Sequence, residues 1–154
     1  MIYRKIGKTG VEVSQLGFGC MRLPVINGIT HQINEPLATQ MLRHAIDNGV
    51  NYVDTAFPYH GYGFDRGGES EPFVGRALRD GYRQKVQLAT KLPSWLISCH
   101  ADMDKYLNEQ LARLETDHID FYLAHAINKG FWKNLTAHDL FRFLDRALAD
   151  GRIR

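Results

Sequence analysis

The chain has 154 residues, of which 44% are hydrophobic and 23% are charged, a composition typical of globular proteins and too apolar for intrinsic disorder. Nineteen basic and seventeen acidic residues leave a net charge of +2 without runs of like charge, which argues against nucleic-acid or membrane-surface partners. We expect a single domain over residues 1–154, which is long enough to bury a core without disulfides.

The cysteine content and the amino terminus bear on the compartment. Cys20 and Cys99 are too few and too far apart for a disulfide framework or a metal site, and both fit a reducing environment. Residues 1–6 contain no apolar stretch of signal-peptide length, and no segment approaches the roughly 20 apolar residues of a membrane span. We therefore expect a cytoplasmic protein.

The first predicted elements are a hairpin and a short strand. Residues 3–14 form two short runs around the turn Gly7-Lys-Thr-Gly10, which is typical of a β-hairpin. Residues 15–21 predict a short buried strand whose glycines indicate close approach of another backbone.

Helices and strands then alternate. Asn34 is a predicted cap for a helix that ends at Gly49, and a strand follows over residues 50–56. Ser70 is the predicted cap of a second helix, which precedes a strand over residues 86–91.

The alternation continues to the last residues. Ser98 is the predicted cap of a third helix with an apolar face, and residues 118–125 predict a fourth strand. Thr136 and Asp139 resemble a weak capping box for one last helix that stops at Gly151.

Strands that alternate with helices of this length predict successive parallel βαβ units, so the fold class is α/β. An open doubly wound sheet and part of a (β/α)8 barrel are both compatible with the pattern. The barrel is favoured because no GxGxxG segment opens a helix after a strand and because polar residues gather at strand ends. A complete barrel needs about 250 residues. We expect the hairpin and the first four βα units, with residues 151–154 where a fifth strand would begin.

Four polar residues lie at or just past predicted strand ends: Asp54, Tyr59, Lys91 and His125. Each of three has a structural alternative, because Asp54 could cap a turn, Tyr59 could pack among neighbouring aromatic residues and His125 could be a core histidine. Lys91 is harder to explain structurally, since a lysine that ends an apolar strand needs a carboxylate partner. Parallel strands place these ends on one face, so the four side chains could converge.

Five segments, in chain order, carry a family pattern: Leu16-Gly-Phe-Gly-Cys-Met-Arg-Leu23, Asn51-Tyr-Val-Asp-Thr-Ala56 with Tyr59, Gly68-Glu-Ser-Glu-Pro-Phe-Val-Gly-Arg-Ala-Leu78, Leu88-Ala-Thr-Lys91 and Asp117-His-Ile-Asp-Phe-Tyr-Leu-Ala-His125. They resemble the aldo-keto reductase family, whose fold is a (β/α)8 barrel with an amino-terminal hairpin at its bottom. The resemblance covers about the first half of a family member. It is nearest to a bacterial branch that often carries a carboxyl-terminal iron-sulfur module, so a cluster would lie outside these residues.

The resemblance implies roles for the four polar residues. Asp54, Tyr59, Lys91 and His125 match the catalytic tetrad of a family that reduces aldehydes or ketones to alcohols with NADP(H). Tyr59 would donate the proton, Lys91 would stabilise the phenolate, Asp54 would hold Lys91 and His125 would hydrogen-bond the carbonyl. A catalytically silent NADP(H)-binding or regulatory module and an inactive truncated fragment remain the alternatives.

The resemblance also implies cofactor contacts. The nicotinamide of NADP(H), or of NAD(H) as the alternative, would meet the backbone of Gly19, Cys20 and Met21 and the acidic Asp54. The residues that hold the pyrophosphate and the 2′-phosphate would come from later strands, beyond Arg154. No metal ligand is expected.

Two tryptophans and an open sheet complete the predictions. Trp95 and Trp132, in predicted loops after the third and fourth strands, could line a pocket for a small carbonyl substrate or pack against the rim.

Four units cannot close a barrel, so we expect unpaired edges and missing packing partners on the inner faces near Val53 and Ile119. Such edges could be covered by a second copy or by a partner that supplies the second half.

Overall fold

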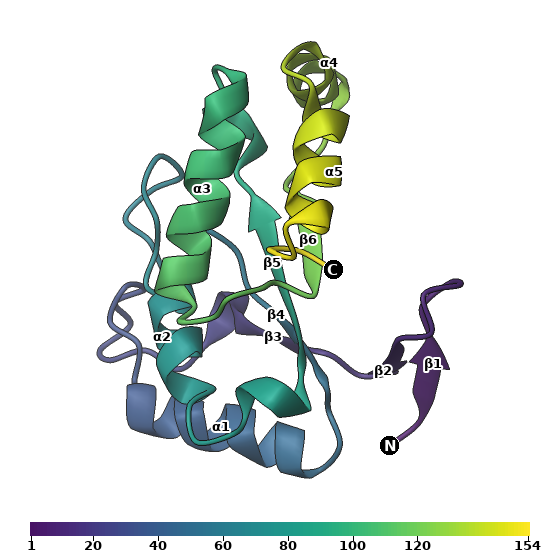
Figure 1. The fold of residues 1–154 in the computed structure, drawn as a ribbon. Helices are drawn as coiled ribbons and strands as arrows, with labels where there is room; N and C mark the ends of the chain where they lie inside the picture. Colours follow the sequence, from purple (N-terminus) through teal and green to yellow (C-terminus); the bar gives the residue numbers. More distant parts are fainter.

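The computed structural model describes all residues from 1 to 154 and shows a four-stranded parallel sheet with helices packed against it (Figure 1). Strand order in the sheet follows chain order: β3 (Phe18–Gly19), β4 (Tyr52–Asp54), β5 (Gln87–Leu92) and β6 (Phe121–Ala124). All three strand pairs are parallel. The predicted α/β class and the four successive parallel strands are therefore confirmed.

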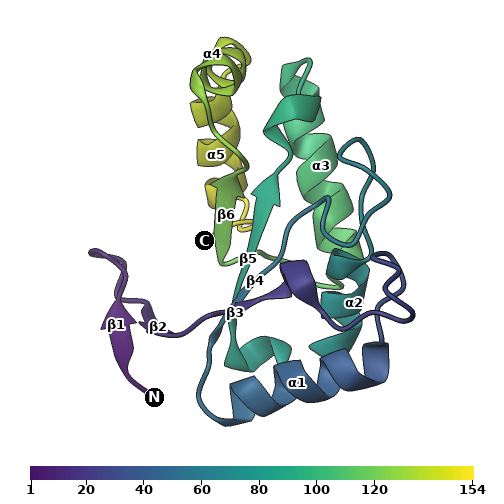
Figure 2. The ribbon, with the colours of Figure 1, turned by 180° about the vertical axis from the view of Figure 1, so that it is seen from behind.

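The predicted hairpin forms a separate two-stranded sheet. Strands β1 (Tyr3–Lys5) and β2 (Glu12–Ser14) pair antiparallel, and both turn glycines, Gly7 and Gly10, have the positive φ that favours glycine. Asn51, just before β4, binds the hairpin: its Oδ1 accepts from the Ser14 backbone N–H at 2.6 Å and its amide donates to the Glu12 carbonyl at 3.0 Å. The hairpin therefore lies at the amino end of β4 (Figure 2).

Five α-helices and three short 3-10 helices connect the strands. They are η1 (Cys20–Arg22), α1 (Glu35–Asp47), α2 (Ser70–Ala77), η2 (Arg83–Lys85), η3 (Ser94–Leu96), α3 (His100–Arg113), α4 (Lys129–Ala137) and α5 (Leu140–Ala149). Helix α1 packs on α2, α2 on α3 and α3 on α5. None of these helices has the length and apolarity that a membrane crossing requires.

The first helix begins and ends as predicted. The Asn34 side chain accepts a hydrogen bond from the Leu37 backbone at 3.3 Å, which satisfies one of the free N–H groups at the start of α1. Gly49 follows the helix with φ +95°, as expected of a glycine that ends a helix.

The predicted caps of α2 and α3 are each displaced by one residue. Glu69 is the N-cap of α2, and the Ser70 hydroxyl donates instead to the Cys20 carbonyl at 3.1 Å. Cys99 is the N-cap of α3, and the carboxylate of Asp102 accepts from its backbone N–H at 3.0 Å. The Ser70 hydroxyl thus binds a residue distant in the chain, and the Ser98 hydroxyl binds the nearby Asp102 carboxylate. Neither serine is therefore the N-cap of its helix.

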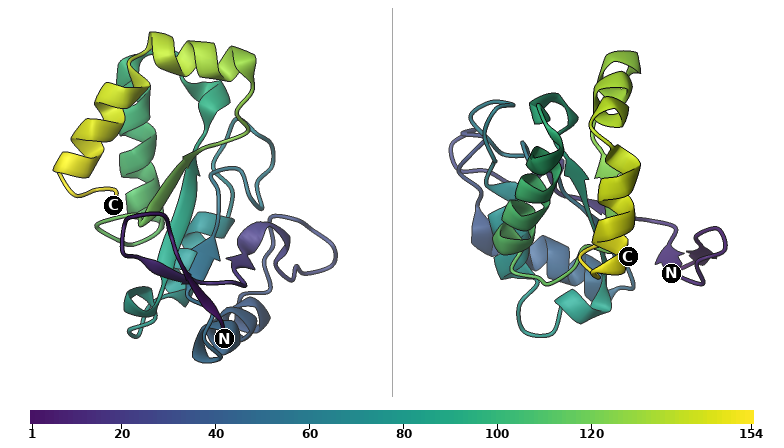
Figure 3. Two further views of the ribbon diagram at one scale, coloured as in Figure 1. Left: turned by 90° about the vertical axis from the view of Figure 1, so that its right-hand side faces the viewer. Right: turned by 45° about the horizontal axis from the view of Figure 1, so that its top comes forward.

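The last predicted helix is present as α5, and a helix that the sequence did not predict, α4, precedes it; Figure 3 shows the two meeting at an angle. Asn128 caps α4 by accepting from the Phe131 backbone at 2.9 Å. The Thr136 hydroxyl donates to the Trp132 carbonyl within α4, and Asp139, the N-cap of α5, makes no side-chain cap bond. The predicted capping box is therefore wrong, and Trp132 lies on a helix rather than in a loop.

The two faces of the sheet differ in packing. Along β5, Leu88 and Leu92 belong to the core beneath the helices, whereas Lys91 lies on the opposite face. Val53 and Ile119 also belong to that core and have no exposed surface, so these two side chains point toward the helices rather than toward the inner face. Alternation along the strands places the least covered side chains on the opposite, inner face.

The sheet is open at β6. A parallel bridge pairs Ile119 with Ile153: the Ile119 N–H donates to the Arg152 carbonyl at 2.9 Å and the Arg154 N–H donates to the Ile119 carbonyl at 3.1 Å. Residues 152–154 therefore run alongside the chain before β6, where a fifth strand was predicted to begin.

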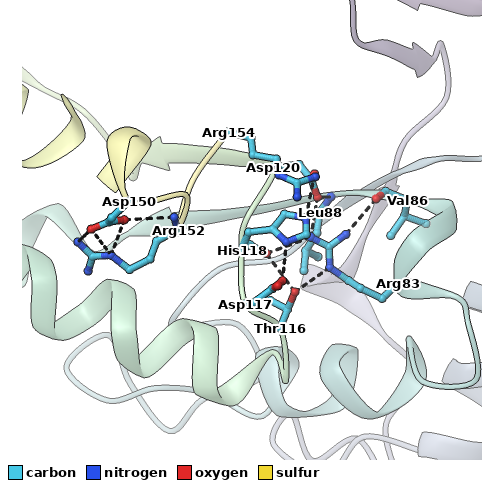
Figure 4. A network of polar contacts seen from close by, with 10 residues as sticks. All are labelled: Arg83, Val86, Leu88, Thr116, Asp117, His118, Asp120, Asp150, Arg152 and Arg154. Atoms are coloured by element: carbon cyan, nitrogen blue, oxygen red, sulfur yellow. Dashed lines mark hydrogen bonds and ion pairs between the residues drawn. The ribbon is translucent and has the colours of Figure 1, made fainter. Parts of the chain in front are cut away.

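A polar network joins the amino ends of β5 and β6 (Figure 4). The Arg83 guanidinium donates to a carboxylate oxygen of Asp120 at 2.8 Å, and the same oxygen accepts from the Leu88 backbone at 2.8 Å. Arg83 also donates to the His118 carbonyl at 3.0 Å and the Thr116 hydroxyl at 3.0 Å. These bonds hold η2 against the amino ends of β5 and β6, at the end of the sheet opposite the polar cluster described next.

Candidate active site

The structure brings the four predicted polar residues together at the carboxyl ends of the strands. Asp54 ends β4, Lys91 is the second-last residue of β5, His125 directly follows β6, and Tyr59 lies in the loop after β4. The registers pair Asp54 with Ala89 and Lys91 with Leu123, so neighbouring strands deliver their terminal side chains to one end of the inner face.

Lys91 is the centre of the cluster. Its ammonium nitrogen donates to Asp54 Oδ1 at 2.7 Å, to the Thr55 carbonyl at 2.7 Å and to the Tyr59 hydroxyl oxygen at 3.3 Å. The same nitrogen lies 4.8 Å from the centroid of the Tyr59 ring. Because a lysine ammonium has three N–H donors, these three acceptors satisfy it completely and fix its position. The structural need for a carboxylate partner of Lys91 is met by Asp54.

His125 faces the cluster with its ring. The centroid of its ring lies 5.9 Å from that of Tyr59, with the ring planes at 86°. Burial lowers the pKa of His125, the Lys91 charge lowers it further, and the Asp54 carboxylate opposes both effects. The imidazole is therefore neutral at pH 7.

The surroundings of His125 also favour one tautomer. Its Nδ1 atom is buried without a hydrogen-bond partner. A buried N–H without an acceptor would cost more than a buried lone pair, so we assign the proton to Nε2. The histidine can then donate a hydrogen bond from Nε2 to a group at the mouth of the cluster.

The carboxyl end of β3 presents open backbone beside Asp54. Gly19 pairs with Asp54, no atom lies within 4 Å of where a side chain at Gly19 would begin, and Met21 is exposed. Cys20 is fully buried, and both its burial and the Asp54 charge raise its pKa. Its carbonyl accepts from Ser70, so the Cys20 side chain belongs to the core while its neighbours face outward. The open position at Gly19, next to the Asp54 carboxylate, could hold a flat ring such as a nicotinamide.

A buried polar network supports Lys91 from the helix side. The Gln110 amide of α3 donates to the Lys91 carbonyl at 3.1 Å and to a carboxylate oxygen of Glu71 at 2.6 Å, and its oxygen accepts from the Tyr122 hydroxyl at 2.8 Å. Glu71 also accepts from Thr90 at 2.7 Å. Burial raises the pKa of Glu71, and its hydrogen-bond donors oppose that rise. The network ties the end of β5 to both α2 and α3.

Sequence reasoning missed this supporting network. Its one signal is position: Gln110 lies three residues after Leu107 and four before Leu114, on the apolar face of α3, and it has no exposed surface. A polar side chain on such a face must find partners inside the protein. Glu71, in the segment that carries the family pattern, is also fully buried, and its carboxylate likewise finds hydrogen-bond partners inside the protein.

The two predicted pocket tryptophans lie in different surroundings. The Trp95 ring, in η3, lies 5.2 Å from that of His125, so it joins the cluster. The Trp132 ring instead packs edge-on against Phe141 of α5, with the ring centroids 5.9 Å apart. The structure thus places Trp95 beside the candidate site, and a role for Trp132 in a pocket stays a prediction.

The sequence and the fold of the chain are similar to those of known proteins. Residues 15–154 match the family model described as "Aldo/keto reductase family". The chain is 32% identical over 169 residues to "Probable aldo-keto reductase 1" of Glycine max, which covers 97% of the chain and 42% of that protein. It is 36% identical over 134 residues to "Aldo-keto reductase YhdN" of Bacillus subtilis, which covers 81% of the chain and 38% of that protein.

A solved structure gives the same result. The holo form of an aldo-keto reductase from Bacillus halodurans superposes with a TM-score of 0.76 at 29% identity, covering all of this chain and 48% of that one. The chain thus spans less than half the length of these three proteins and contains about half of their (β/α)8 barrel, as predicted. The chain belongs to the aldo/keto reductase family.

Proposed function

We propose that this protein supplies the catalytic half of an NADP(H)-dependent reductase that converts aldehydes or ketones to alcohols. The observation that carries the proposal is the position of the Lys91 ammonium, which is within hydrogen-bonding distance of both Asp54 and Tyr59. His125 completes the group by facing Tyr59 across the mouth. Four side chains from three strands and one loop thus surround one place where a carbonyl oxygen can bind.

The arrangement suits protonation of a carbonyl oxygen. Reduced nicotinamide supplies the hydride when it is bound. As negative charge develops on the substrate oxygen, the Tyr59 hydroxyl can donate its proton there. The Lys91 ammonium already donates to the Tyr59 oxygen and so stabilises the phenolate that remains, while Asp54 keeps Lys91 charged and oriented.

His125 acts on the substrate by position. A neutral imidazole with its proton on Nε2 can donate to the carbonyl oxygen, and it holds that oxygen beside Tyr59. The lowered pKa of His125 keeps the ring neutral, so it orients and polarises the carbonyl without itself serving as the acid.

The cofactor proposal depends on β3 and Asp54. The backbone at Gly19, Cys20 and Met21 would hold the nicotinamide, with Asp54 at its edge. We propose NADP(H) as the cofactor, as the family resemblance implies. NAD(H) is the alternative, because the residues expected to distinguish the two cofactors lie outside the part of the barrel described above. We also propose a cytoplasmic location, on the basis of the two unpaired cysteines.

The proposal is tested by nicotinamide oxidation at 340 nm with a panel of aldehydes, using the complete gene product that contains residues 1–154. Replacing Tyr59 by Phe should lower kcat by at least about 100-fold, because general acid catalysis contributes that much or more. The matched control is Tyr82→Phe, since the Tyr82 hydroxyl binds Asp47 at the surface, away from the cluster. Equal rates for wild type and Tyr59→Phe would refute the role of Tyr59. Tight NADPH binding without oxidation by any carbonyl would instead identify a silent binding module.

A further inference from the structure

The loop of residues 61–67 begins and ends beside Tyr59. Backbone hydrogen bonds close its base: the Gly68 N–H donates to the Phe57 carbonyl at 2.7 Å, and the Ser70 N–H donates to the Tyr59 carbonyl at 3.2 Å. A Cβ atom at Gly68 would overlap the Tyr59 carbonyl, so only glycine allows the two sides of the base to approach this closely. The position of the loop is therefore coupled to the backbone of Tyr59.

Two aromatic contacts hold the loop across the mouth. Tyr62 stacks on His31, which lies between η1 and α1, with ring centroids 3.9 Å apart and planes at 27°. Further along, the Trp95 indole N–H donates to the Phe64 carbonyl at 2.8 Å, and the Phe64 ring meets the Trp95 ring edge-on at 6.2 Å. The loop thus extends from the β3 side of the mouth to the β5 side.

These contacts place four rings in a continuous aromatic row: Phe64, Trp95, His125 and Tyr59. Successive centroids lie 6.2, 5.2 and 5.9 Å apart. One end of the row is formed by His125 and Tyr59, the two groups proposed to bind the carbonyl oxygen, and the other end is Phe64, which is 76% exposed. A large apolar ring with this exposure, fixed at the rim by its own backbone, is available to a ligand.

We propose that Phe64, together with Trp95, forms an apolar wall that selects carbonyl substrates with an aromatic or bulky apolar substituent. The inference rests on the proposed function, because Tyr59 and His125 fix the carbonyl oxygen at one end of the row. A flat substituent that extends from the carbonyl carbon along the row would cover Trp95 and Phe64 and remove apolar surface from water. A small or hydrophilic aldehyde would gain nothing from this wall.

The kinetic test compares two aldehydes in the complete gene product. Phe64→Ala should lower kcat/KM for 2-naphthaldehyde by about tenfold or more, and kcat/KM for propanal should change less than about twofold. The substitution keeps the Phe64 carbonyl that accepts from Trp95, so it removes only the ring. Phe64→Leu, which retains apolar bulk, should restore most of the preference. The control is Leu148→Ala, which also removes an exposed apolar side chain but lies on α5, away from the proposed site. An unchanged ratio of the two kcat/KM values in Phe64→Ala would refute the wall.

A binding test needs no turnover. Isothermal titration with 2-naphthalenemethanol, an aromatic alcohol that resembles the reduced product, should show an affinity for wild type at least about fivefold higher than for Phe64→Ala. If this difference appears while no carbonyl is reduced, the wall stands and the proposed reductase activity fails. Equal affinities, or no binding to wild type, would refute the wall even if the enzyme reduces aldehydes.

Discussion

The Lys91 ammonium nitrogen lies 3.3 Å from the Tyr59 hydroxyl oxygen, and its two other N–H groups donate to Asp54 and to the Thr55 carbonyl. A charge fixed in this way stabilises a phenolate without having to reorganise first. The contact also separates the proposed roles of two residues, since Lys91 touches Tyr59, the proposed proton donor, while Gly19 lies on the proposed cofactor side.

Replacing Lys91 by Met should therefore affect the chemical step. We expect kcat to fall by at least about 100-fold, while the Kd for NADPH changes only a few-fold, because Lys91 acts through Tyr59. Lys85→Met is the control, since Lys85 pairs with Asp47 at the surface. Steady-state kinetics and NADPH titration measure the two effects. A variant that loses NADPH affinity and keeps kcat would contradict this assignment.

Replacing Gly19 by Leu should affect the cofactor instead. Gly19 has an ordinary extended backbone, with φ −93° and ψ 126°, so leucine can adopt its conformation without strain. Its side chain would fill the open space beside Asp54 where the nicotinamide is proposed to lie. We expect the Kd for NADPH to rise at least about tenfold with an unchanged unfolding midpoint. An unchanged Kd would place the cofactor elsewhere.

His125 should make stability depend on pH. Because its pKa is lowered in the folded state, the unfolded chain binds the proton more readily, and stability falls as pH decreases from about 6.5 toward the folded pKa. His125→Gln should therefore lose less stability than wild type between pH 7 and pH 5. Urea midpoints at both pH values measure the difference, with the exposed His44→Gln as control. Parallel losses in wild type and His125→Gln would show that this histidine is not responsible.

The Arg83–Asp120 pair should matter for stability rather than chemistry. Both side chains are largely buried, and Asp120→Ala would leave the Arg83 charge without its partner, which typically costs about 3–5 kcal/mol. The Arg79–Glu115 pair has comparable geometry but is exposed, so Arg79→Met should change the urea midpoint little. Similar losses for the two variants would mean that burial of the Arg83–Asp120 pair does not set its contribution.

The polypeptide of residues 1–154 alone should bind NADPH weakly and show negligible reductase activity. It contains the proposed nicotinamide contacts, but its sheet is open at β3 and β6, and we propose that these edges are covered by a second copy or by a second half of the barrel. Isothermal titration, a reductase assay and sedimentation measure affinity, turnover and association. A monomer with micromolar NADPH affinity and sustained turnover would contradict this expectation.

Much of the fold could be predicted from the sequence because local patterns determine it. The turn glycines of the hairpin, the Asn34 cap and the alternation of strands with amphipathic helices depend on neighbouring residues, and all appear in the structure. The convergence of Lys91 with Asp54 also follows from parallel strands, which deliver their carboxyl ends to one side.

The remaining features depend on contacts between residues far apart in the chain. Ser70 was predicted as a cap, but its hydroxyl binds Cys20, fifty positions earlier. In the sequence, Gln110 is a polar residue that interrupts the apolar face of a helix. Its role follows only from the folded structure, in which it donates to Glu71 and to the Lys91 carbonyl. The contact between Phe64 and Trp95 likewise could not be predicted, because Phe64 lies in a loop whose sequence lacks the hydrophobic periodicity of a helix or strand.

The burial of Cys20 has a consequence for chemical compatibility. Accessible thiolates add to aldehydes to form hemithioacetals, so a nucleophilic sulfur beside the proposed carbonyl site would trap the compounds proposed to bind there. Cys20 adjoins Gly19, yet its thiol is fully enclosed and its raised pKa keeps it protonated. The chain therefore tolerates a cysteine next to the proposed cofactor contacts, because burial favours the protonated thiol and keeps electrophiles away from the sulfur.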